Sequence, residues 1–133
     1  MLALASRCAV LIVEDHEDTA GMLIRLLKRR GVTAESVATG MEALEFLDVG
    51  AAPKCVILDH GLPGGMDGLE LFRQLKARPT LAGIPVIFYS ASYEWQKQME
   101  AEALGAAGWY IKGVASLKDV FERVDELCGD RTP

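Results

Sequence analysis

The feature that most constrains the fold of this chain is a strict alternation of strand-like and helix-like segments. Apolar runs typical of strands occupy residues 9–13, 32–38, 54–59, 85–89 and 108–111. Helix-like segments follow them, at 17–30, 40–47, 68–77, 93–104 and 117–127; the segment at 93–104 is mainly polar, whereas others show helical spacing of apolar residues. Because crossovers between parallel strands are right-handed and their helices cover the sheet, this pattern predicts an α/β fold, a five-stranded parallel sheet with helices on both faces.

Length and charge narrow the class of protein. The 133 residues fit a single domain, which we expect to span residues 1–133 with a core at about 7–128. A net charge of -5 counts against direct binding to nucleic acid or to an anionic membrane, because both bind clustered Lys and Arg. Cys8, Cys55 and Cys128 lack the spacing of a zinc site and fit a reducing compartment. With no signal-peptide pattern and no membrane-spanning run, we expect a cytoplasmic protein.

Acidic residues follow two of the predicted strands. Glu14 and Asp15 come directly after the first strand, and Asp59 ends the third. Ligands of open α/β sheets bind at the carboxyl ends of the strands, so these acids are expected at one edge. Carboxylates crowded together raise one another's pKa unless a counter-charge is present, and Mg²⁺ is a cation that prefers such ligands. We therefore expect a magnesium site here; the alternative is that these acids merely cap helices or face solvent.

Two further polar residues follow the remaining strands at the same edge. Ser90 follows the fourth strand and Lys112 the fifth. With strand order 2-1-3-4-5, the first and third strands are neighbours at the topological switch point. A carboxylate nucleophile, a hydroxyl and an ammonium group together suit transfer of a phosphoryl group onto an aspartate. Taken singly, Ser90 would be interpreted as a helix N-cap and Lys112 as a solvated strand end.

Taken together, these motifs resemble the receiver domains of two-component response regulators, with a chemotaxis-regulator-like organisation, over essentially the whole chain. The resemblance is carried by five motifs in order: residues 11–15, 57–59, 62–68, 85–91 and 105–112. It implies a flavodoxin-like, doubly wound (βα)5 sandwich with sheet order 2-1-3-4-5. It also implies a phosphoprotein of phosphorelay signal transduction.

The resemblance further implies a role for each site residue. Asp59 would accept a phosphoryl group from a sensor histidine kinase or a histidine phosphotransfer protein. Ser90 and Lys112 would contact the resulting aspartyl phosphate, and Ser90 with Trp109 would form the switch. The chain would assist its own phosphorylation and dephosphorylation without being an enzyme in the usual sense. A downstream protein, or the chain's own output domain, would receive the signal. The implied Mg²⁺ ligands are Glu14, Asp15, Asp59 and the backbone carbonyl of Gly61.

Some positions depart from the family's usual pattern. The turn at Gly64 and Gly65 is one residue longer than usual. Gly113 replaces a proline whose peptide bond is commonly cis, and a cis bond before another residue costs about 2.5–4 kcal/mol. We therefore expect a trans bond after Lys112. Gly61 and Ser92 are small residues beside the expected phosphate, and would leave it open to water.

Several alternatives stay open at this point. The chain could be a pseudo-receiver, a protein-interaction module that works without phosphorylation. It could also be a magnesium-dependent phosphatase, although such hydrolases usually carry an acid where Gly61 stands. Trp109 could be a packed core aromatic instead of a switch, with Tyr110 on the opposite face. Trp95 would contact a partner or cover a loop, and His60 is expected at the rim of the site.

Overall fold

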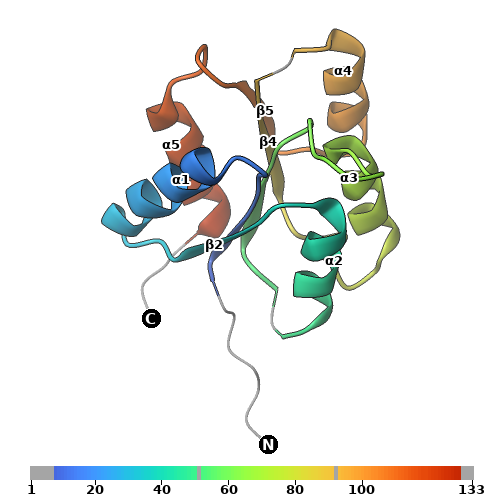
Figure 1. Cartoon of the computed structure of the whole chain (residues 1–133), viewed down its shortest axis with the longest axis horizontal. Coiled ribbons are helices and arrows are strands. Elements are labelled where there is room, and N and C mark those ends of the chain that lie inside the picture. Colours follow the sequence, from blue (N-terminus) through green and yellow to red (C-terminus); the bar gives the residue numbers. More distant parts are fainter. Residues whose placement is uncertain (1–7, 51, 92, 130–133) are drawn as a thin grey trace, which may run out of the picture.

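The computed structural model describes residues 8–50, 52–91 and 93–129, so Ser92 lies outside the described residues. One parallel sheet runs through the molecule in the order β2-β1-β3-β4-β5 (Figure 1). Its strands are β1 (Val10–Val13), β2 (Ala34–Val37), β3 (Cys55–Leu58), β4 (Val86–Ser90) and β5 (Gly108–Ile111). The predicted flavodoxin-like (βα)5 fold and its strand order are therefore confirmed.

Five helices cover the two faces of this sheet. They are α1 (Glu17–Arg29), α2 (Gly40–Asp48), α3 (Gly68–Ala77), α4 (Trp95–Ala103) and α5 (Leu117–Cys128). Helices α1 and α5 lie on one face, and α2, α3 and α4 lie on the other (Figure 1). Each face has its own apolar core, as expected for a sheet whose crossovers are all right-handed.

Alternating side chains of the strands supply both cores. Leu11 and Val13 of β1 enter the core beneath α2, α3 and α4, whereas Val10 and Ile12 enter the core beneath α1 and α5. Every residue of β1, β3 and β4 is buried, but the edge strand β2 is only partly covered. Because the central strands are buried on both faces, their sequences are continuously apolar rather than alternating.

Local signals set the helix starts. The Oγ1 of Thr39 accepts a hydrogen bond of 3.1 Å from the backbone N–H of Glu42 and so caps the start of α2. The hydroxyl of Ser116 likewise accepts from the N–H of Lys118 at the start of α5. The predicted helix at 93–104 begins later, at Trp95. In the described ranges, no helix is long and apolar enough to cross a membrane.

Candidate phosphoacceptor site

The topology brings the predicted acids together at the carboxyl edge of the sheet. Val13 of β1 pairs with Leu58 of β3, so Glu14 and Asp59 leave adjacent strands at the same level. Ligand atoms of Glu14, Asp15, Asp59 and His16 all lie within 4.8 Å of one another. Glu14 and Asp59 are buried, with 4% and 6% of their surface exposed.

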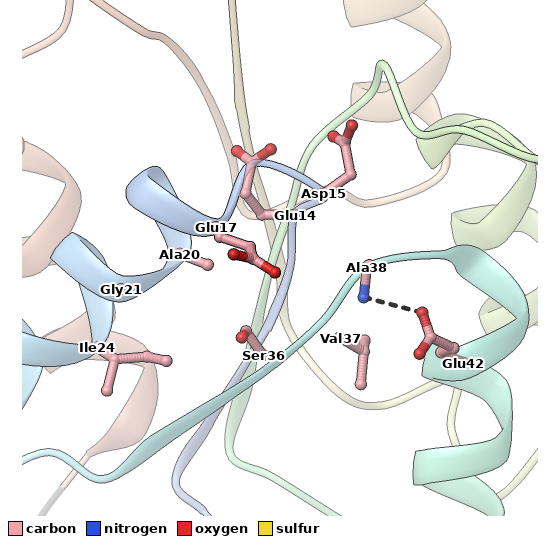
Figure 2. A pocket seen from close by; sticks show the side chains of 10 residues that line it. All are labelled: Glu14, Asp15, Glu17, Ala20, Gly21, Ile24, Ser36, Val37, Ala38 and Glu42. Atoms are coloured by element: carbon pink, nitrogen blue, oxygen red, sulfur yellow. Dashed lines mark hydrogen bonds between the residues drawn. The ribbon is translucent and has the colours of Figure 1, made fainter.

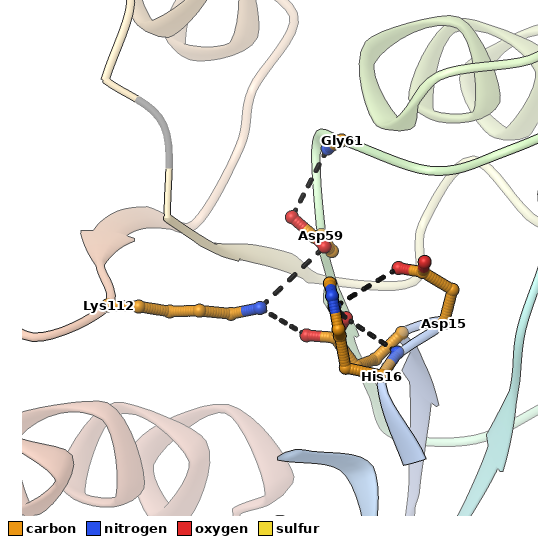
Figure 3. A network of polar contacts seen from close by, with 6 residues as sticks. Asp15, His16, Asp59, Gly61 and Lys112 are labelled. Atoms are coloured by element: carbon orange, nitrogen blue, oxygen red, sulfur yellow. Dashed lines mark hydrogen bonds and ion pairs between the residues drawn. The ribbon is translucent and has the colours of Figure 1, made fainter. Parts of the chain in front are cut away.

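The carboxylate of Asp59 is held by contacts on both of its oxygens. Its Oδ1 accepts a hydrogen bond of 3.2 Å from the backbone N–H of Gly61, and its Oδ2 lies 3.7 Å from the Nζ of Lys112 (Figure 3). The backbone N–H of Asp59 donates to the carbonyl of Val13, which continues the sheet to this residue. The acid is therefore fixed in place by backbone and side-chain contacts.

Lys112 reaches the acids from the end of β5. Its Nζ donates a hydrogen bond to Oε1 of Glu14 as well as approaching Asp59. The bond to Gly113 is trans, as expected. Gly113 has a φ of 81°, whereas proline is restricted to about -65°, so this path of the chain excludes proline. Without a proline at position 113, the chain after Lys112 takes a path that proline could not take. The side chain of Lys112 still reaches the acids of the site.

The oxygen atoms present fit a hard divalent cation such as Mg²⁺. Oδ1 of Asp15 is inaccessible to solvent and has no hydrogen-bond partner among the described residues. A buried carboxylate oxygen without a partner is an acceptor that a cation would satisfy. Carboxylates from three residues within reach of one another are the type of ligand that Mg²⁺ prefers. The donor set thus matches the predicted metal.

His16 is a member of this cluster that sequence reasoning missed. Its Nδ1 lies 3.2 Å from Oε2 of Glu14 and 3.5 Å from Oδ1 of Asp15, although 71% of its side chain is exposed. Its position directly after the two acids was the available signal. His16 is also the N-cap residue of α1, and its backbone N–H donates a hydrogen bond of 3.2 Å to Oε2 of Glu14.

Ser90 and Trp109 lie on strands β4 and β5. Ser90 is 1% exposed, and its carbonyl accepts a hydrogen bond from the N–H of Lys112. Trp109 pairs with Phe88 in the sheet, and the two rings stack with centroids 4.8 Å apart and planes at 16°. Trp109 packs against the core beneath α2, α3 and α4, and Tyr110 packs against the other core, so the two side chains take opposite faces as predicted.

His60 is buried, which corrects the expectation that it would lie at the rim. It is 7% exposed, and its ring centroid lies 5.9 Å from that of Trp109. The carbonyl of His60 accepts hydrogen bonds from the N–H groups of Leu62 and Gly68, so the chain turns back over it. A Cβ on Gly68 would lie 2.4 Å from the carbonyl oxygen of Asp59 and 2.7 Å from the Cα of His60. Only a glycine allows α3 to begin this close to the acceptor.

The longer turn is accommodated by glycine and packed by Met66. Gly64 has a φ of 85°, which few other residues adopt readily. Met66 lies against the start of α2, where a Cβ on Gly40 would meet its Sδ at 2.7 Å. Met66 also packs against the neighbouring core. Asp67 follows this turn and caps α3 through a 2.8 Å hydrogen bond that its Oδ1 accepts from the N–H of Glu70.

A cavity of about 350 Å³ opens beside the acids, between α1 and the segment that joins β2 to α2 (Figure 2). Glu14 and Asp15 form its end at the site, and Glu17 and Glu42 add further carboxylates to its walls. The cavity is open to solvent and strongly acidic. It gives small cations and water a route to Glu14 and Asp15.

Known proteins are similar to this chain in sequence and in fold. Residues 10–125 match the family model described as the response regulator receiver domain. The chain is 32% identical over 124 residues to the phosphate regulon transcriptional regulatory protein PhoB of Rhizobium meliloti, covering 93% of this chain and 53% of that protein. It is 35% identical over 116 residues to the sensory transduction protein RegX3 of Mycobacterium bovis, covering 87% of this chain and 48% of that protein.

A solved structure shows the same fold over nearly the whole chain. It is the signal receiver domain of a signal transduction histidine kinase from Syntrophus aciditrophicus, with a TM-score of 0.81 and 31% identity. The match covers 95% of each chain. By contrast, this chain spans about half the length of the curated relatives that it matches. The family match, the shared fold and the acids at the sheet edge agree, and the chain belongs to the response regulator receiver domain family.

Proposed function

We propose that this receiver domain accepts a phosphoryl group on Asp59 from a phosphohistidine of a sensor kinase or a histidine phosphotransfer protein. The observation that carries the proposal is the position of the Asp59 carboxylate. It is buried at the end of β3, 3.7 Å from the ammonium group of Lys112 and grouped with the carboxylates of Glu14 and Asp15. A fixed nucleophile next to a cation is what phosphoryl transfer requires of a protein.

The reaction needs positioning and charge stabilisation more than acid–base chemistry. An oxygen of Asp59 forms a bond to phosphorus while the bond between phosphorus and the donor's imidazole nitrogen breaks, and that nitrogen takes up a proton. Lys112 stabilises the negative charge on the phosphoryl oxygens. We assign the hydroxyl of Ser90 to a further phosphoryl oxygen. When bound, Mg²⁺ neutralises the acids and the phosphoryl group; Glu14, Asp15, Asp59 and the carbonyl of Gly61 would hold it.

Dephosphorylation uses the same residues. Water attacks the phosphorus and Asp59 leaves as a carboxylate, with Lys112 again stabilising the charge. Gly61 presents no side chain that shields the phosphoryl group, and Ser92, two residues after Ser90 in the sequence, is small as well. The domain thus assists its own phosphorylation and dephosphorylation but acts on no other substrate.

The phosphoryl group acts as a signal through a change in the site. Added charge at Asp59 would bias the arrangement of Ser90 and Trp109. The receiving partner is a downstream protein or an output domain on a longer form of this chain. Because the proposed donors are kinases that use cellular phosphoryl groups, we assign the domain to the cytoplasm.

Intact-mass measurement after incubation with acetyl phosphate tests this proposal. We expect a gain of one phosphoryl group that requires Mg²⁺ and is lost in Asp59→Asn. The matched control is Asp18→Asn, which removes an exposed acid of α1 that lies outside the cluster. The control should take up phosphate like the unaltered chain. No gain in any sample would contradict the proposal and favour an interaction module that works without phosphorylation.

A further inference from the structure

The buried ring of His60 contacts the half-buried ring of Trp109 beside Asp59, and each ring carries a buried polar atom that is unsatisfied. Their centroids are 5.9 Å apart and their planes are tilted by 47°. Nδ1 of His60 and Nε1 of Trp109 are both inaccessible to solvent and lack a hydrogen-bond partner in the part of the chain that the structure describes. Buried polar atoms are nearly always paired in folded proteins, so two unpaired atoms on adjoining rings need a physical explanation.

The two atoms are complementary in their chemistry. The indole Nε1–H of Trp109 is a donor only, and a neutral histidine with its proton on Nε2 offers Nδ1 as an acceptor. A turn of the indole about its side-chain torsions would allow one hydrogen bond to satisfy both atoms. In a buried environment such a bond is stronger than in water, and leaving both groups unpaired is correspondingly unfavourable.

A competing contact holds the indole in its present position. Trp109 stacks almost parallel on Phe88, with centroids 4.8 Å apart, and Phe88 is fully buried. Both residues are also fixed in the sheet, where they are paired between β4 and β5. The indole therefore has two alternative arrangements. In one it stacks on Phe88, and in the other it donates a hydrogen bond to His60.

The phosphoacceptor Asp59 is bonded in the chain to His60, one of the two residues that compete for the indole of Trp109. His60 follows Asp59 in the chain, and the next N–H, that of Gly61, donates to Oδ1 of Asp59. A phosphoryl group on this carboxylate changes its charge and its acceptor geometry, so the turn that carries His60 is affected first. Ser90 lies two residues after Phe88 in β4, so both side chains point to the same face of the sheet. Trp109 covers this face, so a contact between Ser90 and the phosphoryl group would form next to the indole.

We propose that His60 is a positioning residue whose Nδ1 accepts a hydrogen bond from the indole N–H of Trp109 when Asp59 is phosphorylated. The new bond replaces part of the stack on Phe88 and changes how Trp109 lies against β4. This inference rests on the proposed function, because phosphorylation of Asp59 is its trigger. It adds to that function a specific acceptor for the indole.

The test observes the indole N–H itself. Trp95 and Trp109 are the two tryptophans of the sequence, and Trp95 is 61% exposed, so Trp95→Phe leaves a single indole N–H signal in the NMR spectrum. In this background the signal is recorded with and without acetyl phosphate and Mg²⁺, and phosphoryl uptake is measured by intact mass on the same samples. We expect phosphorylation to slow the hydrogen exchange of the Trp109 indole by roughly two- to tenfold.

Two substitutions of His60 separate hydrogen bonding from packing. His60→Asn places an amide oxygen where Nδ1 lies, because both atoms are bonded to Cγ, and it should retain the slowing. His60→Leu fills the space without an acceptor, and it should lose the slowing while taking up phosphate to the same extent. Equal slowing in phosphorylated His60→Leu, or none in the phosphorylated background chain, would overturn the inference alone. Absence of phosphoryl uptake in the background chain would overturn the proposed function and the inference with it.

Discussion

The ammonium group of Lys112 joins acids that lie at the ends of two neighbouring strands. Its Nζ donates to Glu14 of the β1 end and lies 3.7 Å from Oδ2 of Asp59 at the β3 end. Only 18% of the lysine side chain is exposed, and both acids are buried, so solvent screens these charges weakly. Lys112 is thus placed both to compete with a cation for Glu14 and to stabilise negative charge on Asp59.

Replacing Lys112 with methionine should change these two properties in opposite directions. Mg²⁺ should bind more tightly, because the acids lose a competing cation, and phosphoryl uptake from acetyl phosphate should slow by about 100-fold. Tryptophan fluorescence during a Mg²⁺ titration measures the first effect, and intact mass against time measures the second. Lys118→Met is the control, since Lys118 is an exposed lysine of α5. Weaker Mg²⁺ binding in Lys112→Met would contradict this account.

Asp15→Asn tests whether the carboxylate of Asp15 contributes to Mg²⁺ binding. Oδ1 of Asp15 is buried and has no hydrogen-bond partner among the described residues, so its negative charge is available to a cation. Losing that charge should weaken Mg²⁺ binding by roughly tenfold or more. Isothermal titration calorimetry measures the affinity. Glu17→Gln is the matched control, because Glu17 lines the same cavity but does not belong to the acid cluster. Equal affinity in the two variants would remove Asp15 from the ligand set.

Gly68→Ala tests the close approach of α3 to the acceptor. The new Cβ would meet backbone atoms of Asp59 and His60, which cannot move independently of the site. We expect the free energy of unfolding to fall by about 1–3 kcal/mol, as measured by urea denaturation. Gly83→Ala is the control, because a Cβ there meets nothing within 4 Å, and it should change stability by less than about 0.5 kcal/mol. Similar values for both variants would show that the contact relaxes without cost.

Alkaline pH should destabilise the domain through Cys55. Burial raises the pKa of this thiol far above its ordinary value, and the nearby Cys128 adds to the effect while Arg123 opposes it. The unfolded thiol ionises near pH 8.5, at about its ordinary pKa, while the folded thiol stays protonated. The unfolded state therefore binds fewer protons above that pH, and stability falls as pH rises, by up to about 1.4 kcal/mol per pH unit.

Thermal or urea unfolding at several pH values from about 8 to 10 measures this slope. Cys55→Ala should unfold more easily at neutral pH but should show a shallower loss toward alkaline pH. Burial also raises the pKa values of Tyr89 and Tyr110, so part of the slope should persist in the variant. An identical slope in the unaltered chain and in Cys55→Ala would contradict the assignment.

Much of the fold and the positions of the acids could be predicted because they depend on sequence patterns with a simple physical basis. Continuous apolar runs such as Val10–Val13 identify strands buried on both faces. The residue after such a strand must lie at the carboxyl edge, so Glu14, Asp59 and Lys112 were expected at one place before any contact was known. The trans bond after Lys112 followed from the energetic cost of the alternative.

Other features of the site depend on tertiary contacts that leave little trace in the sequence. The buried ring of His60 packs beside Trp109, and the start of α3 at Gly68 lies against its backbone. The place of His16 in the acid cluster depends on the conformation at the start of α1. The periodicity of apolar residues in the sequence does not indicate that conformation. The path of the chain after Lys112 depends on the positive φ of Gly113, and a sequence pattern shows only that proline is missing.

The measurement that tests the central claim most directly is the location of the phosphoryl group. Hydroxylamine converts an aspartyl phosphate to a hydroxamate, which survives proteolysis and can be assigned to a residue by peptide mass spectrometry. After incubation with acetyl phosphate and Mg²⁺, the account predicts a hydroxamate on Asp59 and none on Glu14, Asp15 or Asp67. A phosphorylated chain that carries the hydroxamate on another acid, or none at all, would contradict the assignment of Asp59 as the phosphoacceptor.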